Sequence, residues 1–142
     1  MAFSHGKDSV VSIDNTSGAL TAISTYTDTV DGLPGEIELA DVTGFGEEGH
    51  KNVPGLENAS VSCGGSYDGS AAAIMDIIGS TTQRKAATRT FEWGPGGSAS
   101  GQIKFSAEVW VQAFTVSSSV SDKVTWSATL QVDGVVTMST YA

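Results

Sequence analysis

The strongest constraint on the fold is a long alternation of apolar and polar residues in the last third of the chain. Every second residue from Ile103 to Ala113 is apolar, and the pattern resumes after a polar stretch at 117–122 and runs to Val132. Alternation of this kind is typical of β-strands with one buried face. The sequence therefore predicts a long β-hairpin over about 102–133, with strands longer than the roughly five or six residues that are usual.

The remaining sequence also favours extended structure. The chain has 142 residues with 17 glycines, and valine outnumbers leucine, a bias that favours strands. Gly and Pro clusters divide it into short segments typical of a sandwich or barrel. We expect a single mainly β domain over 1–142, a β-sandwich or partial barrel. The expected short strands lie at 9–13, 19–23, 36–43, 59–63, 86–93 and 135–138.

One segment, 70–78, predicts a short helix. Ser70 can cap its N-terminus, three alanines follow with high helix propensity, and Gly79 can end it. A helix this short is unstable alone, so we expect it to flank the sheet.

The long hairpin presents a second face of mixed character. Lys104, Glu108 and Gln112 alternate there with Trp110 and Phe114. A solvated sheet face is normally polar, so large apolar groups on it favour contact with another chain. A second apolar layer supplied by the helix of the same chain is the alternative, and both interpretations are open.

Charge is unevenly distributed along the chain. The formal net charge is −9, and the segment 28–57 is strongly acidic with only Lys51 to offset it. Three bases, Arg84, Lys85 and Arg89, lie close together after the expected helix. Such a division is found on ordinary solvated surfaces, and in a self-assembling subunit it gives complementary head-to-tail contacts. The negative charge opposes sequence-independent binding to nucleic acid.

No catalytic or metal-binding pattern is evident. The chain has a single cysteine, Cys63, which lies on the apolar side of an expected strand and reads as a buried thiol. His50 follows two glutamates, but without a defined ligand spacing. We therefore predict a non-enzymatic protein with no cofactor and no metal. The N-terminal residues lack the pattern of a secretory signal, and no apolar run is long enough to cross a membrane, which suits synthesis in the cytoplasm.

The segment 31–79 resembles tail tube proteins, also called major tail proteins, of long-tailed bacteriophages. The matching elements are DVTGFG at 41–46, VPGL at 53–56, the dipeptide Tyr67-Asp68 and the short helix that follows. The long C-terminal hairpin with its tryptophans is similar to that family too. The elements occur in the same order, and the resemblance covers most of 8–139.

This resemblance implies a structural virion protein. In that family, subunits form hexameric rings, the rings stack into a tube, and strands from every subunit complete an inner β-barrel around a channel for DNA ejection. The resemblance implies that the loop at about 43–56 reaches the next ring, with the stacking residues Thr43, Gly44, Phe45, Gly46, Glu47, Glu48, His50 and Lys51.

Further roles follow from the same resemblance. Lys104, Glu108 and Gln112 become candidates for the channel wall, and the bases Arg84, Lys85 and Arg89 become a candidate patch complementary to the acidic region. Like charge on the wall keeps DNA from adhering as it passes. The implied partners are other copies of the chain and tail terminator, tape measure and baseplate proteins, and the implied location is the virion tail.

Two other functions are compatible with the sequence. One is a different virion ring component, such as a tail terminator or head–tail connector. The other is a carbohydrate-binding β-sandwich, in which Trp93, Trp110 and Trp126 would supply faces for stacking on sugars.

Overall fold

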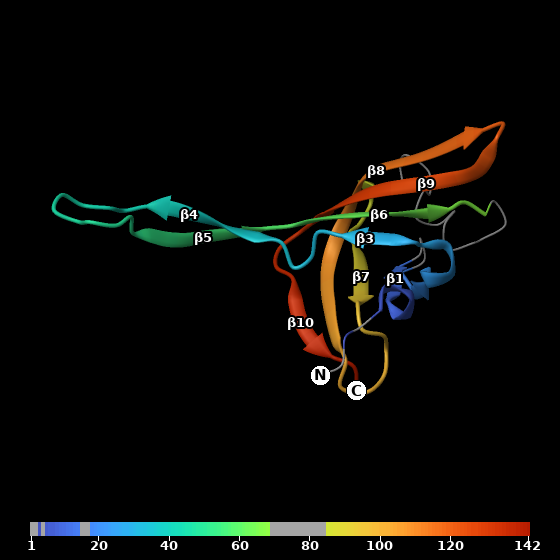
Figure 1. The fold of residues 1–142 in the computed structure, drawn as a ribbon, viewed down its shortest axis with the longest axis horizontal. Helices are drawn as coiled ribbons and strands as arrows, with labels where there is room; N and C mark the ends of the chain where they lie inside the picture. Colours follow the sequence, from blue (N-terminus) through green and yellow to red (C-terminus); the bar gives the residue numbers. More distant parts are fainter. Residues whose placement is uncertain (1–2, 4, 15–17, 69–84) are drawn as a thin grey trace.

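The computed structural model describes residues 3, 5–14, 18–68 and 85–142, and these residues form an almost entirely β structure (Figure 1). The described elements are the 3₁₀ turns η1 (Gly6–Asp8) and η2 (Ser24–Tyr26) and the strands β1 (Val10–Asp14), β2 (Leu20–Ala22), β3 (Thr29–Asp31), β4 (Glu36–Asp41), β5 (Asn52–Asn58), β6 (Ser60–Ser66), β7 (Arg89–Gly94), β8 (Ile103–Ser119), β9 (Asp122–Val132) and β10 (Thr137–Thr140).

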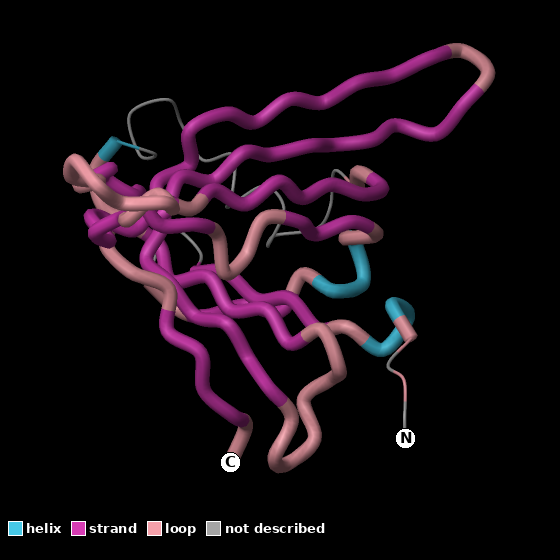
Figure 2. The backbone as a smooth tube through the Cα atoms, turned by 60° about the vertical axis from the view of Figure 1, so that its left-hand side comes forward, coloured by secondary structure: helices cyan, strands magenta, loops and turns pink. Residues whose placement is uncertain are grey.

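Most strands belong to one antiparallel sheet. Its order is β2-β1-β7-β8-β9-β6-β3, and β10 pairs with the first part of β8. The sheet bends, so that β3 and β6 lie across from β1 and β7 (Figures 1 and 2). Strands β4 and β5 pair only with each other and form a separate ribbon, which projects from the body. The described part of the chain is thus a partial barrel with two projections, the β4–β5 ribbon and the end of the β8–β9 hairpin.

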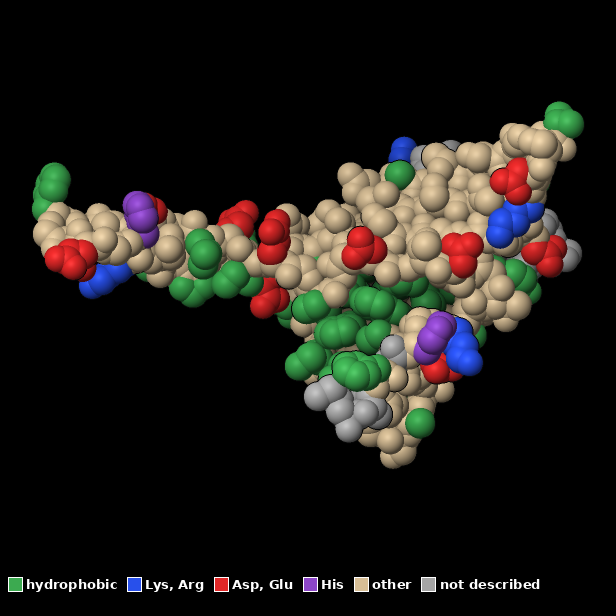
Figure 3. Space-filling model, in the orientation of Figure 1, with side chains coloured by type: hydrophobic (Ala, Val, Ile, Leu, Met, Phe, Trp, Pro, Cys, Tyr) green, Lys and Arg blue, Asp and Glu red, His purple; other side chains and the backbone are tan. Residues whose placement is uncertain are grey.

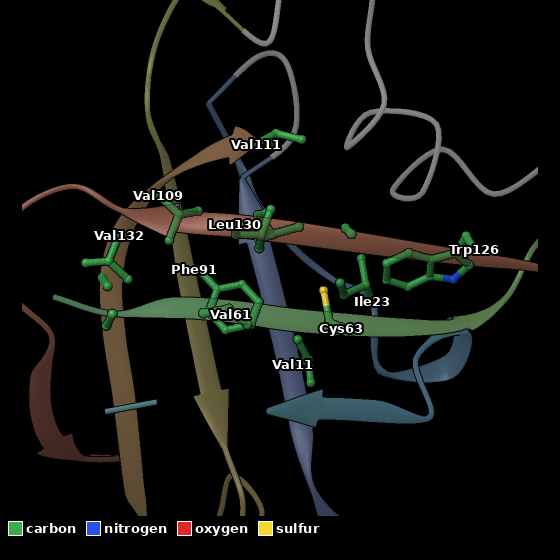
Figure 4. Packing of buried hydrophobic residues seen from close by; sticks show 14 residues of the cluster. Val11, Ile23, Val61, Cys63, Phe91, Val109, Val111, Trp126, Leu130 and Val132 are labelled. Carbon is green, nitrogen blue, oxygen red and sulfur yellow. The ribbon is translucent and has the colours of Figure 1, made fainter. Parts of the chain in front are cut away.

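The core fills the concave side of this bent sheet. Figure 4 shows Val61 and Cys63 of β6 facing the same interior as Phe91 of β7 and Leu130 of β9. These side chains are at most 5% exposed, and Phe91 and Val61 are completely buried. The expected inward faces of β6 and β9 are confirmed, and that of β8 is confirmed over Ala107–Val111, because alternate residues there are the buried ones. The core combines side chains from β1 near the N-terminus with side chains from β6, β7, β8 and β9. It therefore forms only when both halves of the chain are folded together.

The alternation of β8 changes phase at Gln112. Val111 lies opposite Leu130, whereas Ala113 lies opposite Thr129, so β8 has one more residue than β9 at this point. This is a β-bulge, which shifts the following side chains to the other face. The expectation that Ala113 would be buried and Phe114 would lie on the mixed face is therefore wrong. Ala113 is exposed, and Phe114 packs against the core.

Other elements agree with the sequence prediction except at their ends. The expected short strands correspond to β1, β2, β4, β6, β7 and β10. β3 and β5 were not expected. The predicted helix at 70–78 falls outside the described residues. No helix among the described residues is both long and apolar enough to traverse a membrane.

Candidate assembly surfaces

The β4–β5 ribbon with its connecting loop, here called the arm (36–58), stands clear of the domain (Figure 1). Every residue of both strands is exposed. The expected assembly loop at about 43–56 lies on this arm, but its second part is strand β5, and the connecting loop is 42–51. At its base Asn58 Oδ1 accepts a hydrogen bond from Gln131 Nε2 of β9 (3.2 Å). Both strands are otherwise exposed along their whole length, so the order of the outer arm depends mainly on its own hydrogen bonds.

Besides the β4–β5 pairing, hydrogen bonds that involve side chains of the arm are concentrated in its connecting loop. The carboxylate of Asp41 accepts hydrogen bonds from Thr43 N (2.9 Å) and from Thr43 Oγ1 (2.6 Å). Thr43 Oγ1 in turn accepts one from Lys51 N across the loop (2.8 Å), and Val42 N donates to Lys51 O (2.8 Å). The bonds from Thr43 lower the pKa of Asp41, and His50 adds to this effect. The loop is thus held in a defined shape before any partner arrives.

Two contacts between a basic and an acidic side chain lie in the same loop, and the one with His50 is an ion pair only when the imidazole is protonated. His50 Nδ1 is 3.4 Å from Asp41 Oδ2, and Lys51 Nζ is 2.9 Å from Glu47 Oε1. All four side chains are largely solvated, so each pair contributes little to stability. Glu48, the other acidic side chain of the loop 42–51, makes no ion pair with any described residue.

The arm also exposes apolar side chains. Phe45 at its end is fully exposed, Leu56 is 77% exposed and Leu39 is 60% exposed. Acidic side chains are distributed along the same projection (Figure 3). A projection with exposed apolar groups and a preformed loop is typical of a surface that another chain covers.

A second surface is the polar face of the sheet. Strand register places Asp14, Thr90 and Glu108 in one row across β1, β7 and β8, and Glu92 lies on the same face with Lys104 close by. Thr90 Oγ1 donates to the Glu108 carboxylate at 3.1 Å, and Thr90 N donates to Asp14 Oδ2 at 3.1 Å. The structure therefore brings two of the candidate channel residues, Lys104 and Glu108, to one face.

The charge of Lys104 is compensated on that face. Its Nζ lies 3.4 Å from Glu92 Oε1 and 5.2 Å from the ring centre of Tyr141. Burial raises the pKa of Tyr141, and the nearby Glu92 raises it further. With Lys104 paired, the carboxylates of Asp14 and Glu108 dominate, so the face is acidic. We call the face formed by Asp14, Thr90, Glu92, Lys104 and Glu108 the acidic face.

The other candidate residues are distributed differently. Gln112 is exposed at the bulge of β8, beyond the acidic face. Lys85 is exposed, whereas Arg89 is 5% exposed because it shares the inward side of β7 with Phe91. Arg84 lies outside the described residues. The three bases therefore do not form a common exposed patch in the described structure, since Arg89 lies inside.

The tryptophans do not form a sugar-binding surface. Trp126 is 2% exposed and donates its indole N–H to Tyr26 O at 3.0 Å. Trp93 packs against Phe105 with ring centres 5.8 Å apart. Trp110, at 36% exposure, is the most accessible of the three and lies on the same face of β8 as Glu108. Among the described residues no group of His, Cys, Asp and Glu side chains is arranged to hold a metal ion.

A groove between two strands of the sheet was not predicted from the sequence. A groove of about 910 Å³ lies between β1 and β3, where the two ends of the bent sheet approach each other. Its lining includes Val11, Val30 and Trp93. No local pattern predicts it, because it depends on how the sheet bends.

Comparison with known proteins extends this picture. No protein-family model matches the chain, and no curated protein matches it. A chain from the tail of an empty gene transfer agent particle, refined with C6 symmetry, superimposes with a TM-score of 0.73 at 15% identity, covering 96% of this chain and 99% of the other. The SPP1 tail tube matches with a TM-score of 0.73 at 15% identity, covering 97% of this chain and 81% of the other. A chain from the sheath/tube terminator of the PVC contractile injection system matches with a TM-score of 0.72 at 15% identity, covering 98% of both.

The fold is that of the proteins that build tails and tubes of phage-like particles. In particular, the chain shares the tail tube fold over nearly its whole length. At the level of the fold, the resemblance seen in the sequence is confirmed.

Proposed function

We propose that the chain is a structural subunit that assembles into stacked rings forming the tube of a phage tail. The observation that carries this proposal is the arm, a preformed projection with exposed apolar side chains on a tail tube fold. A subunit that works alone gains nothing from such a projection, whereas a polymer needs contacts that reach beyond one domain. The role proposed is structural and not catalytic.

Lateral contacts would use the long hairpin. Strand β7 pairs with β8 only up to Val109, and no described strand pairs with the same edge of β8 over 110–119. An unpaired strand edge is a template for pairing with another chain. Joining such edges around a ring would complete an inner barrel. The C6 symmetry of the similar gene transfer agent tail supports a hexameric ring.

The acidic face is the proposed wall of the channel. Asp14 and Glu108 carry negative charge on it, and Glu92 neutralises Lys104. A wall of the same sign as the phosphate backbone lets DNA pass without specific binding. Gln112 would extend this wall as an uncharged polar group.

Stacking between rings would use the arm, with Thr43 to Lys51 at its end as the contact residues. Lys85 is the described member of the base cluster that remains available as a complement to the acidic arm. Tail terminator, tape measure and baseplate proteins are the further partners of this role, and the virion tail is the location. The subunit would be made in the cytoplasm of the host bacterium.

Electron microscopy of the purified chain tests the proposal. The sample is taken through increasing protein and salt concentration, because screening weakens the repulsion between subunits of net charge −9. We expect rings and then tubes of variable length. A protein that stays monomeric under every condition, including addition of preformed tube ends, would contradict the proposal.

A second candidate is a ring that closes the tube. It is favoured by the match to a chain of the sheath/tube terminator, which covers 98% of this chain. The same images separate the two roles. Single closed rings that do not stack at high concentration would support the terminator, and long stacks would support the tube subunit.

A further inference from the structure

The groove between β1 and β3, here called the seam groove, has an apolar floor and a charged rim. Val11, Val30 and Trp93 contribute apolar surface, and the charged residues of the lining are Lys7, Asp28 and Asp31. Its volume of about 910 Å³ lies within the range of protein sites that take a ligand. It is therefore large enough to accept several side chains of an incoming segment.

The walls of the seam groove are held in place. Ser24 Oγ accepts a hydrogen bond from Val11 N at 2.9 Å, and Ser9 Oγ donates to Pro95 O at 2.9 Å. Ile23 N donates to Val11 O at 2.9 Å, which ties η2 to β1. These bonds fix the β1 side of the groove, and pairing of β3 with β6 fixes the other side. A partner would therefore enter a preformed site and lose less conformational entropy on binding.

One wall is an open strand edge. β3 pairs with β6 through Thr29, Val30 and Asp31, and these three consecutive residues also line the groove. Consecutive residues of a strand line one groove only when the strand presents its edge to it, since side chains alternate between faces. No strand of the described residues pairs with this edge. The groove can therefore accept an extended segment by backbone pairing as well as by side-chain contact.

The arm of the same chain does not reach this groove. The arm points away from the body, so its end at 42–51 lies far from β1 and β3, which are within the body (Figure 1). A projection and a receiving site on different parts of one surface make a heterologous contact, which repeats from copy to copy without closing. The occupant that this arrangement fits is a second copy of the chain.

The end of the arm has the chemistry to fill the groove. Phe45 is fully exposed and offers an aromatic ring to the apolar floor. Glu48 has no ion pair among the described residues and is complementary to Lys7 on the rim. Lys51, 62% exposed despite its pair with Glu47, is complementary to Asp31.

We propose that the seam groove of one copy receives the arm end of a second copy, with Phe45 packed against Trp93 and Val30. This inference rests on the proposed function, and it identifies the surface to which the arm binds. Contacts of Glu48 with Lys7 and of Lys51 with Asp31 fix the register of the arm at the rim.

Photocrosslinking in assembled tubes tests the contact directly. A photoreactive benzoyl-phenylalanine replaces Phe45, and chains carrying a heavy isotope are mixed with unlabelled chains so that crosslinks between copies are recognised by mass. We expect crosslinks from position 45 to residues 24–31 or 93–95 of another copy. The control places the same group at Val120, which is equally exposed at the end of the β8–β9 hairpin, and should give no crosslinks to those residues.

Charge exchange provides a second test. Lys7→Glu and Glu48→Lys should each raise the protein concentration needed for tube formation about tenfold, and the double variant should restore most of the loss. Thr29→Trp should block the groove and Phe45→Ala should remove the anchor, while Phe45→Leu retains assembly. Circular dichroism of the dilute variants checks that the subunit stays folded.

The outcomes separate this inference from the proposed function. Tubes of the unmodified chain whose crosslinks from position 45 map to other surfaces would overturn the inference alone. A charge exchange without rescue in the double variant would overturn the contact between Glu48 and Lys7. Failure of the unmodified chain to form any ring or tube would overturn the proposed function and this inference with it.

Discussion

Phe114 stacks on Trp126 with ring centres 5.8 Å apart and ring planes only 5° apart. The two residues come from adjacent strands of the long hairpin, and Trp126 also donates its indole hydrogen to the backbone of Tyr26. The stack connects the projecting end of the hairpin to the core. With Gln112 present, the bulge is what lets Phe114 face inward.

We expect deletion of Gln112 to be tolerated. Removing it makes β8 regular, with Val111 inward, Ala113 outward and Phe114 still inward, so the core is kept. The loss of stability should stay below about 2 kcal/mol in urea unfolding followed by circular dichroism. Deletion of Trp110 is the matched control, because it turns Val111 outward and should abolish cooperative unfolding. Equal damage from both deletions would contradict the assigned register.

Cys63 should be unreactive in the folded subunit. Burial raises the pKa of its thiol to about 12, so almost no thiolate, the reactive form, exists at neutral pH. We expect the aromatic disulfide reagent DTNB to label it only after denaturation. The control is Ser62→Cys in a Cys63→Ala background, which places a thiol on the exposed side of β6 and should react at once. Rapid labelling of native Cys63 would show that the core opens locally.

The arm loop should lose its shape when the hydroxyl of Thr43 is removed. In Thr43→Val the carboxylate of Asp41 loses its shortest hydrogen bond and Lys51 N loses its acceptor, so the pKa of Asp41 should rise towards its ordinary value of 3.8. NMR titration of the dilute subunit measures this change. Thr115→Val, which removes another exposed threonine hydroxyl from a hydrogen bond, should leave the pKa of Asp41 unchanged.

The same bonds give the loop a defined pH dependence. They favour the charged carboxylate, so the folded-loop pKa of Asp41 lies below its value in an open loop. Their contribution is complete above the ordinary pKa of 3.8 and is lost as the pH falls through the lowered value. The amide signal of Thr43 should therefore keep its position down to about pH 4 and shift below it. An amide signal that does not move below about pH 4 would contradict this role of Asp41.

Deletion of 44–52 should separate folding from stacking. No residue of the buried core lies within this segment, so the shortened chain should keep its cooperative unfolding transition. We expect it to form rings but no stacks in electron micrographs. Loss of the folded monomer would contradict the independence of the arm from the core.

Reversal of charge on the acidic face should make tubes retain DNA. Glu108→Lys replaces an exposed carboxylate by an ammonium group on the same face of β8 as Lys104, which converts repulsion of phosphate into attraction. Tubes of this variant should sediment with DNA at low salt and release it as salt rises. Asp122→Lys, at the far end of the hairpin, is the matched control and should bind far less DNA inside the tube. Equal retention by both variants would place the channel elsewhere.

The sequence predicted those parts of the fold that depend on local periodicity. Alternation defined β8, β9 and the inward face of β6, because a period of two separates the two sides of a sheet. Strand β5 was missed because Pro54 and Gly55 usually mark turns, although a ribbon with free edges tolerates both. Nothing in the residues at 111–113 marks the bulge, which is imposed by pairing with β9.

The candidate site was predicted in part. Motif order and alternation, which are visible in the sequence, pointed to the arm residues and to Lys104 and Glu108, and the structure places these on the projecting arm and on one sheet face. Arg89 was placed on the surface since charged residues are usually exposed, but its spacing of two from Phe91 was a usable sign that it faces inward. Glu92 and the seam groove were missed because both depend on strands that are distant in sequence.

The arm contributes no side chain to the core, and this divides the chain into two parts under different selection. Under the proposed contact, substitutions in the body are limited by folding, whereas substitutions in the arm are limited by its fit to a second copy. The arm is therefore free to diverge quickly together with its receptor. Two related proteins with an almost identical body can therefore lose the ability to assemble into one tube after a few substitutions at the end of the arm.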